Sequence, residues 1–471
     1  MTVNQPHGAD SCLVHRPLRL IALCPQTPHD RIGGGGPVRS FYLLMAVGLV
    51  HEISLALLDT NQVVPEPLAS RCRAIIIPRL RPPRGWSRTS CWSRWLGMTY
   101  IAFGDGPALL AAAERNCVSR AEATSGEQRG PIKRLGHTLF AWFLLMAAAL
   151  RAAFFGLRPS RGSERVDFYR GVVDQIEAAH QRCPFTHVWV EHSYLIPEAQ
   201  DLARRLGGLP LIIDAHNVES VLHARLGRLM TSVTARAWYW GQARQLRRVE
   251  ADAFRNAALV LCCSDEDARF IRELAPETRI EVVPNGVDTD YMHPVEPEAT
   301  QPTVAFVGSF GYFPNIDAVT FFHANVLPLI RRAVPNCHFA IIGYGAERFA
   351  ALAGQDPHMT IAANVADIRP YLSQAWVVVV PLRTGSGTRL KILDAMAMGK
   401  PVVSTSVGAE GIAPVARGVV RVADEPAAFA DQVTELLGNV ERRRILGQKG
   451  RQLAEEIFSW SVIGRQVREC S

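Results

Sequence analysis

The sequence predicts an α/β protein built on two doubly wound parallel sheets. Short apolar runs alternate along the chain with stretches of helical periodicity, which is typical of βαβ units. The run 376–380 is apolar throughout, as expected for a parallel strand buried on both faces. With 471 residues, 48% of them hydrophobic, the chain is long enough for two domains.

Polar or glycine-containing segments follow most of the expected strands, as ligand-binding loops do in such sheets. The first group of strands is expected at 19–25, 51–58, 73–78, 186–191, 211–214 and 258–263. The second group is expected at 303–308, 338–345, 359–362, 376–380 and 402–403. Helices are expected at 38 to about 49, at 235 to about 257 and at 367–374. Further helices are expected to begin at 264 and at 388, and another to end at about 332. The part from 427 to the end is expected to be helical.

The first expected strand leads into a loop that ends in four glycines, Gly33 to Gly36, and then into a helical pattern from Val38. Glycines let the backbone approach a ligand, and a helix N-terminus favours an anion. We therefore take Gly34 and Gly35 as candidate phosphate-binding residues, with a flexible linker as the alternative. The spacing is not that of a dinucleotide fingerprint, because Val38 stands where its third glycine is required.

Positive charge is concentrated in residues 80–165. Between Arg71 and Arg161 the chain has 15 Lys and Arg against 4 Asp and Glu, although its net charge is only +7. Basic residues interleaved with aromatic ones fit an anionic membrane surface better than a core. Nucleic acid is not expected as a partner, since no recognition motif accompanies the charge. The aromatic residues are Trp86, Trp92, Trp95, Tyr100 and Trp142.

The apolar run 138–150 contains 13 uncharged residues, and Arg151 separates it from 152–157. It is too short to span a bilayer, which needs about 20 residues. A helix packed in the core and a segment lying in the membrane interface remain the two alternatives.

Cysteine spacing and the N-terminus bear on the compartment. The ten cysteines include no CxxC pair and no metal-ligand spacing, which predicts a reducing compartment and no zinc site. The first ten residues are polar and lack the apolar segment of a signal peptide. We expect a cytoplasmic protein, peripheral on the inner face of the membrane if 80–165 binds lipid.

Two polar clusters follow neighbouring strands of the first expected sheet. Glu191 and His192 end one strand, and His216, Asn217 and Glu219 follow the strand 211–214. Ligands bind at this edge of open α/β sheets. Hydrolase chemistry is not indicated, because no serine or cysteine stands in an elbow sequence nearby. A lone histidine is often structural, which is the alternative for His216.

Two acidic groups could be mistaken for metal ligands. Ser264 precedes three acids, a pattern that caps a helix and complements its positive end. The pair Asp288 and Asp290 follows the turn 283–287. We therefore expect no metal site in this chain.

An anion site is predicted in the segment 381–412, which reads PLRTGSGTRLKILDAMAMGKPVVSTSVGAEGI. Gly385, Ser386 and Gly387 free the backbone, and a helix is expected to begin at Thr388. Its N–H groups and the cations Arg389 and Lys391 suit a phosphate. Asp394, further along the helix, suits the hydroxyls of a ribose. Together they indicate a nucleotide, and an ordinary turn with surface cations is the alternative.

This segment resembles the donor-binding signature of the family-4 glycosyltransferases. The resemblance implies the GT-B fold, in which two Rossmann-like domains face each other across a cleft. That family usually has two glutamates eight positions apart, the second on the ribose, where this chain has Ser386 and Asp394. The family also carries an arginine and a lysine near the loop that here contains Gly308 and Ser309. Neither cation is present, so Arg389 and Lys391 must meet the diphosphate charge.

The resemblance also assigns regions of the first half. It places His216 in the active site, near the sugar and the acceptor hydroxyl, and the glycine loop at the interdomain cleft. It identifies 283–287 as the crossover between domains, which makes Asp288 and Asp290 part of a hinge. The expected domains are 1–285 on the acceptor side, 286–455 for the nucleotide sugar, and 456–471 as a helix packing back on the first domain.

The function implied is transfer of a sugar from a UDP- or GDP-sugar to a hydroxyl of a glycan or lipid-linked acceptor, in envelope or polysaccharide synthesis. The resemblance implies a retaining, metal-independent reaction without a cofactor, in which the leaving phosphate helps to accept the proton. Two alternatives stay open, and the missing first glutamate and loop cations bear on the second of them. They are a sugar-nucleotide epimerase of the same fold and a non-catalytic glycan- or lipid-binding module.

Overall fold

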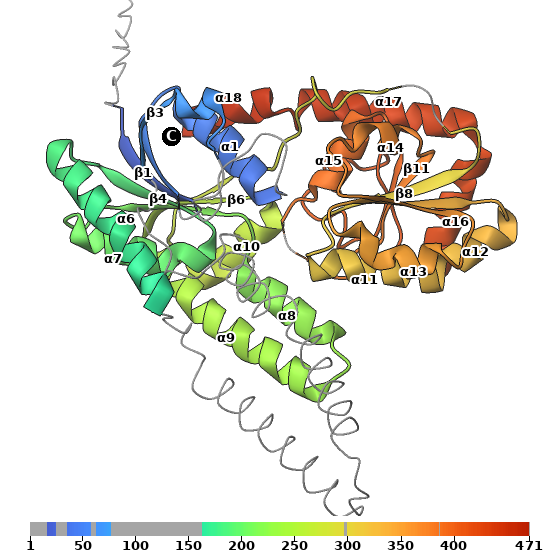
Figure 1. Cartoon of the computed structure of the whole chain (residues 1–471), viewed down its shortest axis with the longest axis horizontal. Helices are drawn as coiled ribbons and strands as arrows, with labels where there is room; N and C mark the ends of the chain where they lie inside the picture. The colour runs from blue at the N-terminus through green and yellow to red at the C-terminus, as the bar shows by residue number, and fades with distance from the viewer. Residues whose placement is uncertain are drawn as a thin grey trace, which may run out of the picture.

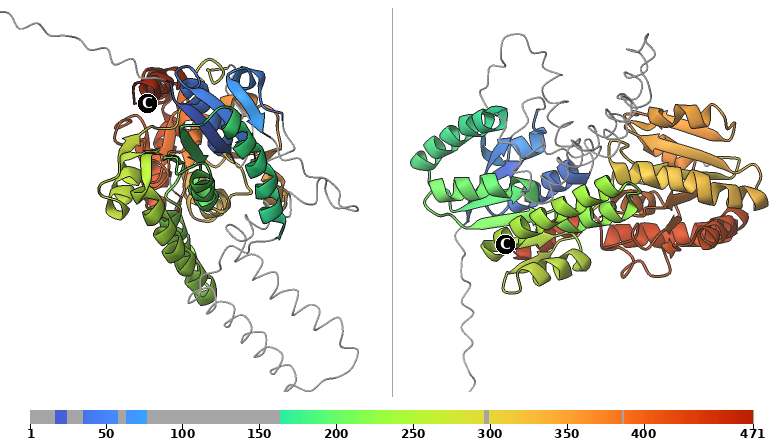
Figure 2. Two further views of the ribbon diagram at one scale, coloured as in Figure 1. Left: turned by 90° about the vertical axis from the view of Figure 1, so that its left-hand side faces the viewer. Right: turned by 90° about the horizontal axis from the view of Figure 1, so that it is seen from below.

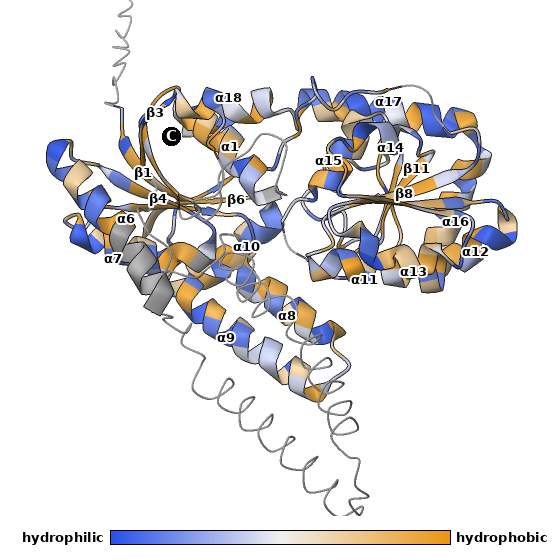
Figure 3. Ribbon diagram, in the orientation of Figure 1, coloured by the Kyte–Doolittle hydropathy of each residue, from blue (hydrophilic) through white to orange (hydrophobic). Residues whose placement is uncertain are grey.

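Two parallel sheets, of seven and six strands, organise two lobes with helices on both faces of each sheet (Figure 1). This computed structural model describes residues 17–24, 35–57, 63–76, 163–295, 299–385 and 387–470. Figure 3 shows that the strands in the middle of each lobe are the most hydrophobic elements. The predicted fold class, two doubly wound parallel sheets, is confirmed.

The first sheet has the strand order β3-β2-β1-β4-β5-β6-β7, and all its strands are parallel. The chain winds outward in one direction from β1 to β3 and in the other from β4 to β7. The carboxyl ends of the central strands therefore form the edge at which open sheets bind ligands. The strands are β1 (Arg19–Cys24), β2 (Glu52–Leu57), β3 (Cys72–Ile76), β4 (His187–Glu191), β5 (Leu211–Ala215), β6 (Ala257–Cys262) and β7 (Ile280–Val282).

Alternate residues of β1 pack into two cores, because successive side chains point to opposite faces of a sheet. Ile21 and Leu23 join the core under α6 and α7, whereas Leu20 and Ala22 join the core under α1. The helices of this lobe are α1 (Gly35–Val47), α2 (Glu66–Ala69), α6 (Ser163–Arg182), α7 (Ile196–Arg205), α8 (Glu219–Leu229), α9 (Val233–Arg255) and α10 (Asp265–Leu274).

The second sheet has the strand order β10-β9-β8-β11-β12-β13. Its strand β11 is fully buried, as its apolar sequence predicts. The strands are β8 (Thr303–Val307), β9 (His338–Gly343), β10 (Met359–Ala363), β11 (Val377–Val380), β12 (Val402–Ser404) and β13 (Arg421–Val422). The helices are α11 (Phe313–Phe321), α12 (Leu327–Ala333), α13 (Ala350–Ala353), α14 (Arg369–Ser373), α15 (Leu390–Ala397), α16 (Pro426–Gly438), α17 (Val440–Glu456) and α18 (Trp460–Cys470).

The end of the chain returns to the first lobe, where α18 packs beside α1 (Figure 1). The rings of Tyr42 and Trp460 are stacked, with centroids 4.8 Å apart and planes 8° from parallel. Gly286 lies against the same indole, where a Cβ would come within 2.7 Å of it. The Val287 amide donates to the Phe458 carbonyl at 2.7 Å. The domain limits at 285 and 455 stay a prediction.

The observed strands match the expected ones to within 2 residues at each end. The short strands β7 and β13 and the helices α2, α6, α7, α8 and α13 were not predicted. The helix expected from Thr388 begins instead at Leu390, because Thr388 makes a tertiary contact and Arg389 is extended, with φ −90° and ψ 101°. A π turn at Phe322–Val326 interrupts the helix expected up to residue 332.

Several predictions lie outside the described residues. They concern Gly34, Ser386, the apolar run 138–157 and the basic segment 80–165, of which only 163–165 are described, at the start of α6. Among the helices that are described, none has the length and apolar character needed to cross a membrane.

Candidate active site

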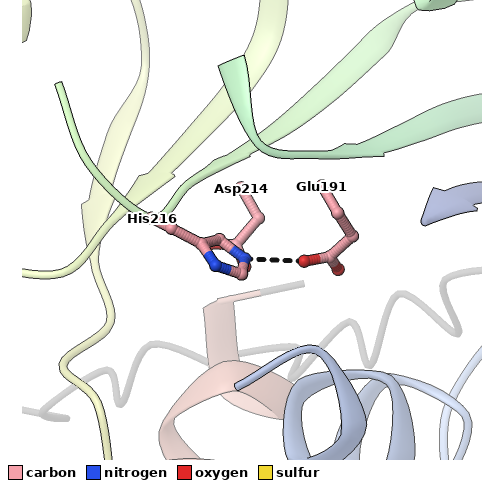
Figure 4. Close-up of side chains that lie close together, drawn as sticks. All are labelled: Glu191, Asp214 and His216. Atoms are coloured by element: carbon pink, nitrogen blue, oxygen red, sulfur yellow. Dashed lines mark hydrogen bonds and ion pairs between the residues drawn. The ribbon is translucent and has the colours of Figure 1, made fainter. Parts of the chain in front are cut away.

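The candidate site lies where the carboxyl ends of β4 and β5 meet α1 and the loop between β11 and α15. Glu191 ends β4, Asp214 lies in β5, and His216 follows that strand directly. The parallel register pairs Glu191 with Asp214, which brings both carboxylates to the His216 ring (Figure 4).

The His216 imidazole is held by two carboxylates. Its Nε2 lies 2.7 Å from Glu191 Oε2 and 3.1 Å from Asp214 Oδ2. Arg39 on α1 donates to both oxygens of Asp214, with Nη2 2.7 Å from Oδ1. Ser40 donates to Glu191 Oε2 at 2.7 Å, while the Trp189 indole donates to Glu191 Oε1 at 2.6 Å. Most of this network is buried, so its orientation is fixed.

The charges of this network decide the protonation of its members. Burial lowers the pKa of His216, but the Asp214 charge and the hydrogen bonds that His216 donates to Asp214 and Glu191 outweigh it and raise that pKa to about 9. Burial raises the pKa of Asp214, whereas Arg39 and His216 hold it well below its usual range. His216 is therefore an imidazolium at neutral pH.

A second histidine, His192, lies against His216, with the two ring planes tilted by 42°. The rings of His192 and His216 have centroids 3.8 Å apart. Burial and the charge of His216 lower the pKa of His192 well below its usual value, so His192 is neutral. The backbone of His192 has φ +69°, a conformation that residues other than glycine rarely adopt. A Cβ on Gly36, the second residue of α1, would lie 2.9 Å from His192 Nε2 and 3.4 Å from His216 Nδ1.

Glu191, Asp214 and His216 are also a group that could hold a metal ion, since their ligand atoms lie within 4.8 Å of one another. The sequence did not predict this cluster. Its chemistry fits a metal poorly, because Arg39 forks onto Asp214 and brings a buried positive charge beside it. A cation would have to displace the guanidinium and compete with the imidazolium.

The loop after β11 crosses to the first lobe. Gly387 has φ +74°, and a Cβ there would lie 2.7 Å from the His216 carbonyl oxygen. Thr388 donates its hydroxyl to the Cys263 carbonyl at 2.9 Å, and Asn285 donates to the Thr388 carbonyl at 3.3 Å. The backbone of this loop is therefore fastened against the residues that follow β5 and β6.

Two cations flank the start of α15. Arg389 is buried and packs on Gly385, where a Cβ would lie 2.8 Å from the Arg389 Cζ. Burial lowers the pKa of Arg389, and burial together with the charge of Arg389 lowers the pKa of Lys391 well below its usual range. Such desolvated cations are stabilised by a bound anion.

Lys391 reaches the loop after β8. Its Nζ donates to Asn315 Oδ1 at 2.6 Å, and a Cβ on Gly308 would lie 3.1 Å from that Nζ. Asn315 in turn donates to the Ser309 carbonyl at 2.8 Å. The predicted residues Gly308, Ser309 and Lys391 thus lie together, joined by Asn315, which sequence reasoning missed.

Asp394 lies one turn further along α15 and is half-buried. Burial raises its pKa to about 7, although the charge of Lys391 opposes this. A carboxyl group that is close to half protonated at neutral pH can either accept a hydrogen bond from a hydroxyl or donate one to it.

Gly35, the remaining predicted site residue that the structure describes, begins α1 next to Gly36.

Comparison with known proteins gives matches over both halves of the chain. The model for glycosyl transferases group 1 matches residues 301–439, and that for Glycosyltransferase Family 4 matches 154–291. The chain is 26% identical over 294 residues to the GDP-mannose-dependent alpha-(1-6)-phosphatidylinositol monomannoside mannosyltransferase of Mycolicibacterium smegmatis, covering 57% of this chain and 71% of that protein. It is also 26% identical over 316 residues to the alpha-maltose-1-phosphate synthase of that organism, covering 59% and 76%.

Solved structures show a likeness of fold. Sucrose-phosphate synthase from Thermosynechococcus elongatus superposes with a TM-score of 0.62 at 15% identity, over 96% of this chain and 98% of that one. HepE of Anabaena, solved with UDP-glucose, gives a TM-score of 0.59 at 11% identity, over 96% and 99%.

Proposed function

Because this chain belongs to the family-4 glycosyltransferases, with the GT-B fold, we propose that it moves a sugar from a nucleoside-diphosphate sugar to a hydroxyl acceptor. One observation carries the proposal. The loop of the second lobe that precedes α15 lies directly against His216 of the first lobe, with the buried Arg389 and the half-buried Lys391 beside it.

The diphosphate would lie at the start of α15. The N–H groups there, together with Arg389 and Lys391, form a preorganised environment for the charge that develops on the leaving group. They substitute for the two loop cations that the chain lacks. Asp394 would bind the ribose hydroxyls. Gly308 and Ser309 would lie on the other side of the diphosphate, where Asn315 connects Ser309 to Lys391 by hydrogen bonds.

His216 would orient the sugar rather than remove a proton. An imidazolium whose Nε2 is held by two carboxylates is a poor base, but its Nδ1 can donate a hydrogen bond. In the retaining transfer that we propose, the bond from the anomeric carbon to the phosphate oxygen breaks on the same face on which the acceptor oxygen bonds. The acceptor proton passes to the departing phosphate. No metal is required, because cations of the chain carry the charge.

The donor is proposed to be a GDP- or UDP-sugar, and the acceptor a glycan or a lipid-linked saccharide. One matched protein is named for GDP-mannose and for a phosphatidylinositol mannoside, and HepE was solved with UDP-glucose. We further propose that residues 80–165 bind an anionic membrane surface on its cytoplasmic side. The domains are proposed to divide at 285 and 455.

A thermal-shift screen tests the proposal. The chain is heated with UDP, GDP and ADP and with their sugars, since a ligand that binds only the folded state raises its melting temperature. We expect one nucleoside diphosphate and its sugar to raise the melting temperature by several degrees, and slow hydrolysis of that sugar nucleotide without acceptor. No shift with any nucleotide, together with no hydrolysis, would contradict the proposed function.

A further inference from the structure

We propose that Arg225, on α8 of the first lobe, is a positioning residue that holds the donor loop 385–388 of the second lobe in its binding shape. This inference rests on the proposed function, since it assigns that loop to the donor. The residue is not part of any motif that the sequence indicates.

One guanidinium joins three segments of the chain. Arg225 Nη1 donates to the Gly385 carbonyl at 2.6 Å and to Glu410 Oε2 at 2.6 Å, while Nη2 donates to Glu410 Oε1 at 2.8 Å. Glu410 lies in the turn after β12, so both partners of Arg225 belong to the second lobe. Forked, charge-assisted hydrogen bonds of this kind fix direction as well as distance.

The Gly385 carbonyl is the point at which the loop needs support. Gly385 has φ +145° and Gly387 has φ +74°, so this part of the loop is built on conformations that other residues avoid. Arg389 packs directly on Gly385. If the Gly385 peptide rotated, it would remove the wall against which the Arg389 guanidinium lies, and the anion site would lose its shape.

The helix that carries Arg225 is itself anchored. Glu250 on α9 accepts hydrogen bonds from the amides of Glu219 and Ser220, at 2.7 Å and 3.2 Å, and so satisfies the first turn of α8. The α8–α9 hairpin reaches the yellow helix α11 of the second lobe (Figure 2, right). There Phe313 packs on a small core formed by both helices of the hairpin. Its buried members are Leu222, Leu226, Met230, Ala235 and Tyr239.

A merely stabilising ion pair is the competing explanation. The side chains of Arg225 and Glu410 are each 21% exposed, and partly exposed pairs contribute little to stability. Removing Arg225 should therefore leave the fold intact while loosening the loop. If the ion pair only stabilises the fold, R225M changes the stability alone. If Arg225 positions the loop, R225M changes the loop and leaves the stability nearly unchanged.

The first measurement is hydrogen exchange of the unliganded protein. We expect R225M to speed exchange of the amides in 384–390 at least about tenfold, because the loop opens more often. The matched control is R228M, which removes an exposed arginine from the same helix and should leave exchange unchanged. This readout needs no activity, so it stands whether or not the proposed function holds. Unchanged exchange in R225M would overturn the inference.

The second measurement is donor kinetics. We expect R225M to raise the KM for the sugar nucleotide by about 10- to 100-fold, with a melting temperature close to that of wild type and an unchanged KM for the acceptor. The swap R225E with E410R restores an ion pair but cannot donate from residue 225 to the Gly385 carbonyl. We expect the swap to stay impaired, and full recovery would overturn the role of the carbonyl contact. If the wild-type protein binds no nucleotide, the proposed function itself is refuted.

Discussion

Gly387 lies so close to the backbone of His216 that a Cβ on residue 387 would stand 2.7 Å from the His216 carbonyl oxygen. The contact joins the two lobes at the point where the proposed diphosphate meets the proposed active-site histidine. Backbone against backbone leaves no room for adjustment by a side chain. The spacing between the donor loop and His216 is therefore set by the fold itself.

We predict that G387A lowers kcat/KM for the sugar nucleotide at least about 100-fold while the protein stays folded, because a misplacement of about 1 Å has effects of this size. The change adds both a clash and an unfavourable φ. G418A separates the two, since Gly418 also has a positive φ, +78°, but nothing within 4 Å of its Cβ. Equal activity of the two variants would show that the contact with His216 is unimportant.

The protonation of His216 should appear in a pH profile. Its folded-state pKa, about 9, lies above its ordinary value of 6.5. The stability from its carboxylate contacts is therefore fully present below pH 6.5 and lost as the pH rises through 9. We expect activity to fall along the same alkaline limb. H216Q should lower kcat about 100-fold or more and flatten the loss of melting temperature between pH 7 and 10.

The exposed residue His293 supplies the control for this measurement, since H293Q should keep both the activity and the alkaline limb of the wild type. If H216Q loses stability with rising pH as steeply as the wild type, the imidazolium proposed at residue 216 is wrong.

The carboxyl groups of the half-buried Glu219 and the buried Glu250 should make stability fall as the pH rises. Burial, and for Glu219 also the charge of Glu250, raises each pKa from 4.5 to about 7. A carboxyl whose pKa is raised by folding binds more protons in the native state. Its contribution is therefore present below pH 4.5 and lost as the pH approaches 7.

E219Q should remove part of this dependence, on the order of 1 kcal/mol in the free energy of unfolding between pH 5 and 8. Urea unfolding at several pH values measures the difference. E273Q, which changes an exposed glutamate, should follow the wild type throughout. An E219Q curve that is parallel to the wild-type curve would be the contrary result.

Much of the fold could be predicted from local pattern. The run that became β11 is apolar at every position, and the polar residues after β4 and β5 follow the general rule for ligand sites in open sheets. Each of these signals is contained in a few consecutive residues of the sequence. The π turn after α11 and the short strands β7 and β13 have no comparable signal.

The network around His216 could not be predicted in the same way. Glu191 reaches His216 only because β4 pairs with β5, and Arg39 meets Asp214 across 175 residues of sequence. Arg225 is one of several arginines on α8 and α9, and nothing in its neighbourhood marks it as the partner of Gly385. Charges that are paired through the tertiary fold leave no periodic trace in the sequence.

The most direct test of a metal-free diphosphate site at the start of α15 is calorimetric titration of the chain with UDP and GDP in EDTA. The wild type should bind one of them, and R389A should lose at least about 100-fold in affinity, because a charge-assisted contact in a buried site is removed. R383A, which removes an exposed arginine paired with Asp317 nearby, should bind like the wild type. Undiminished binding by R389A, or binding by the wild type only after a divalent cation is added, would contradict the account.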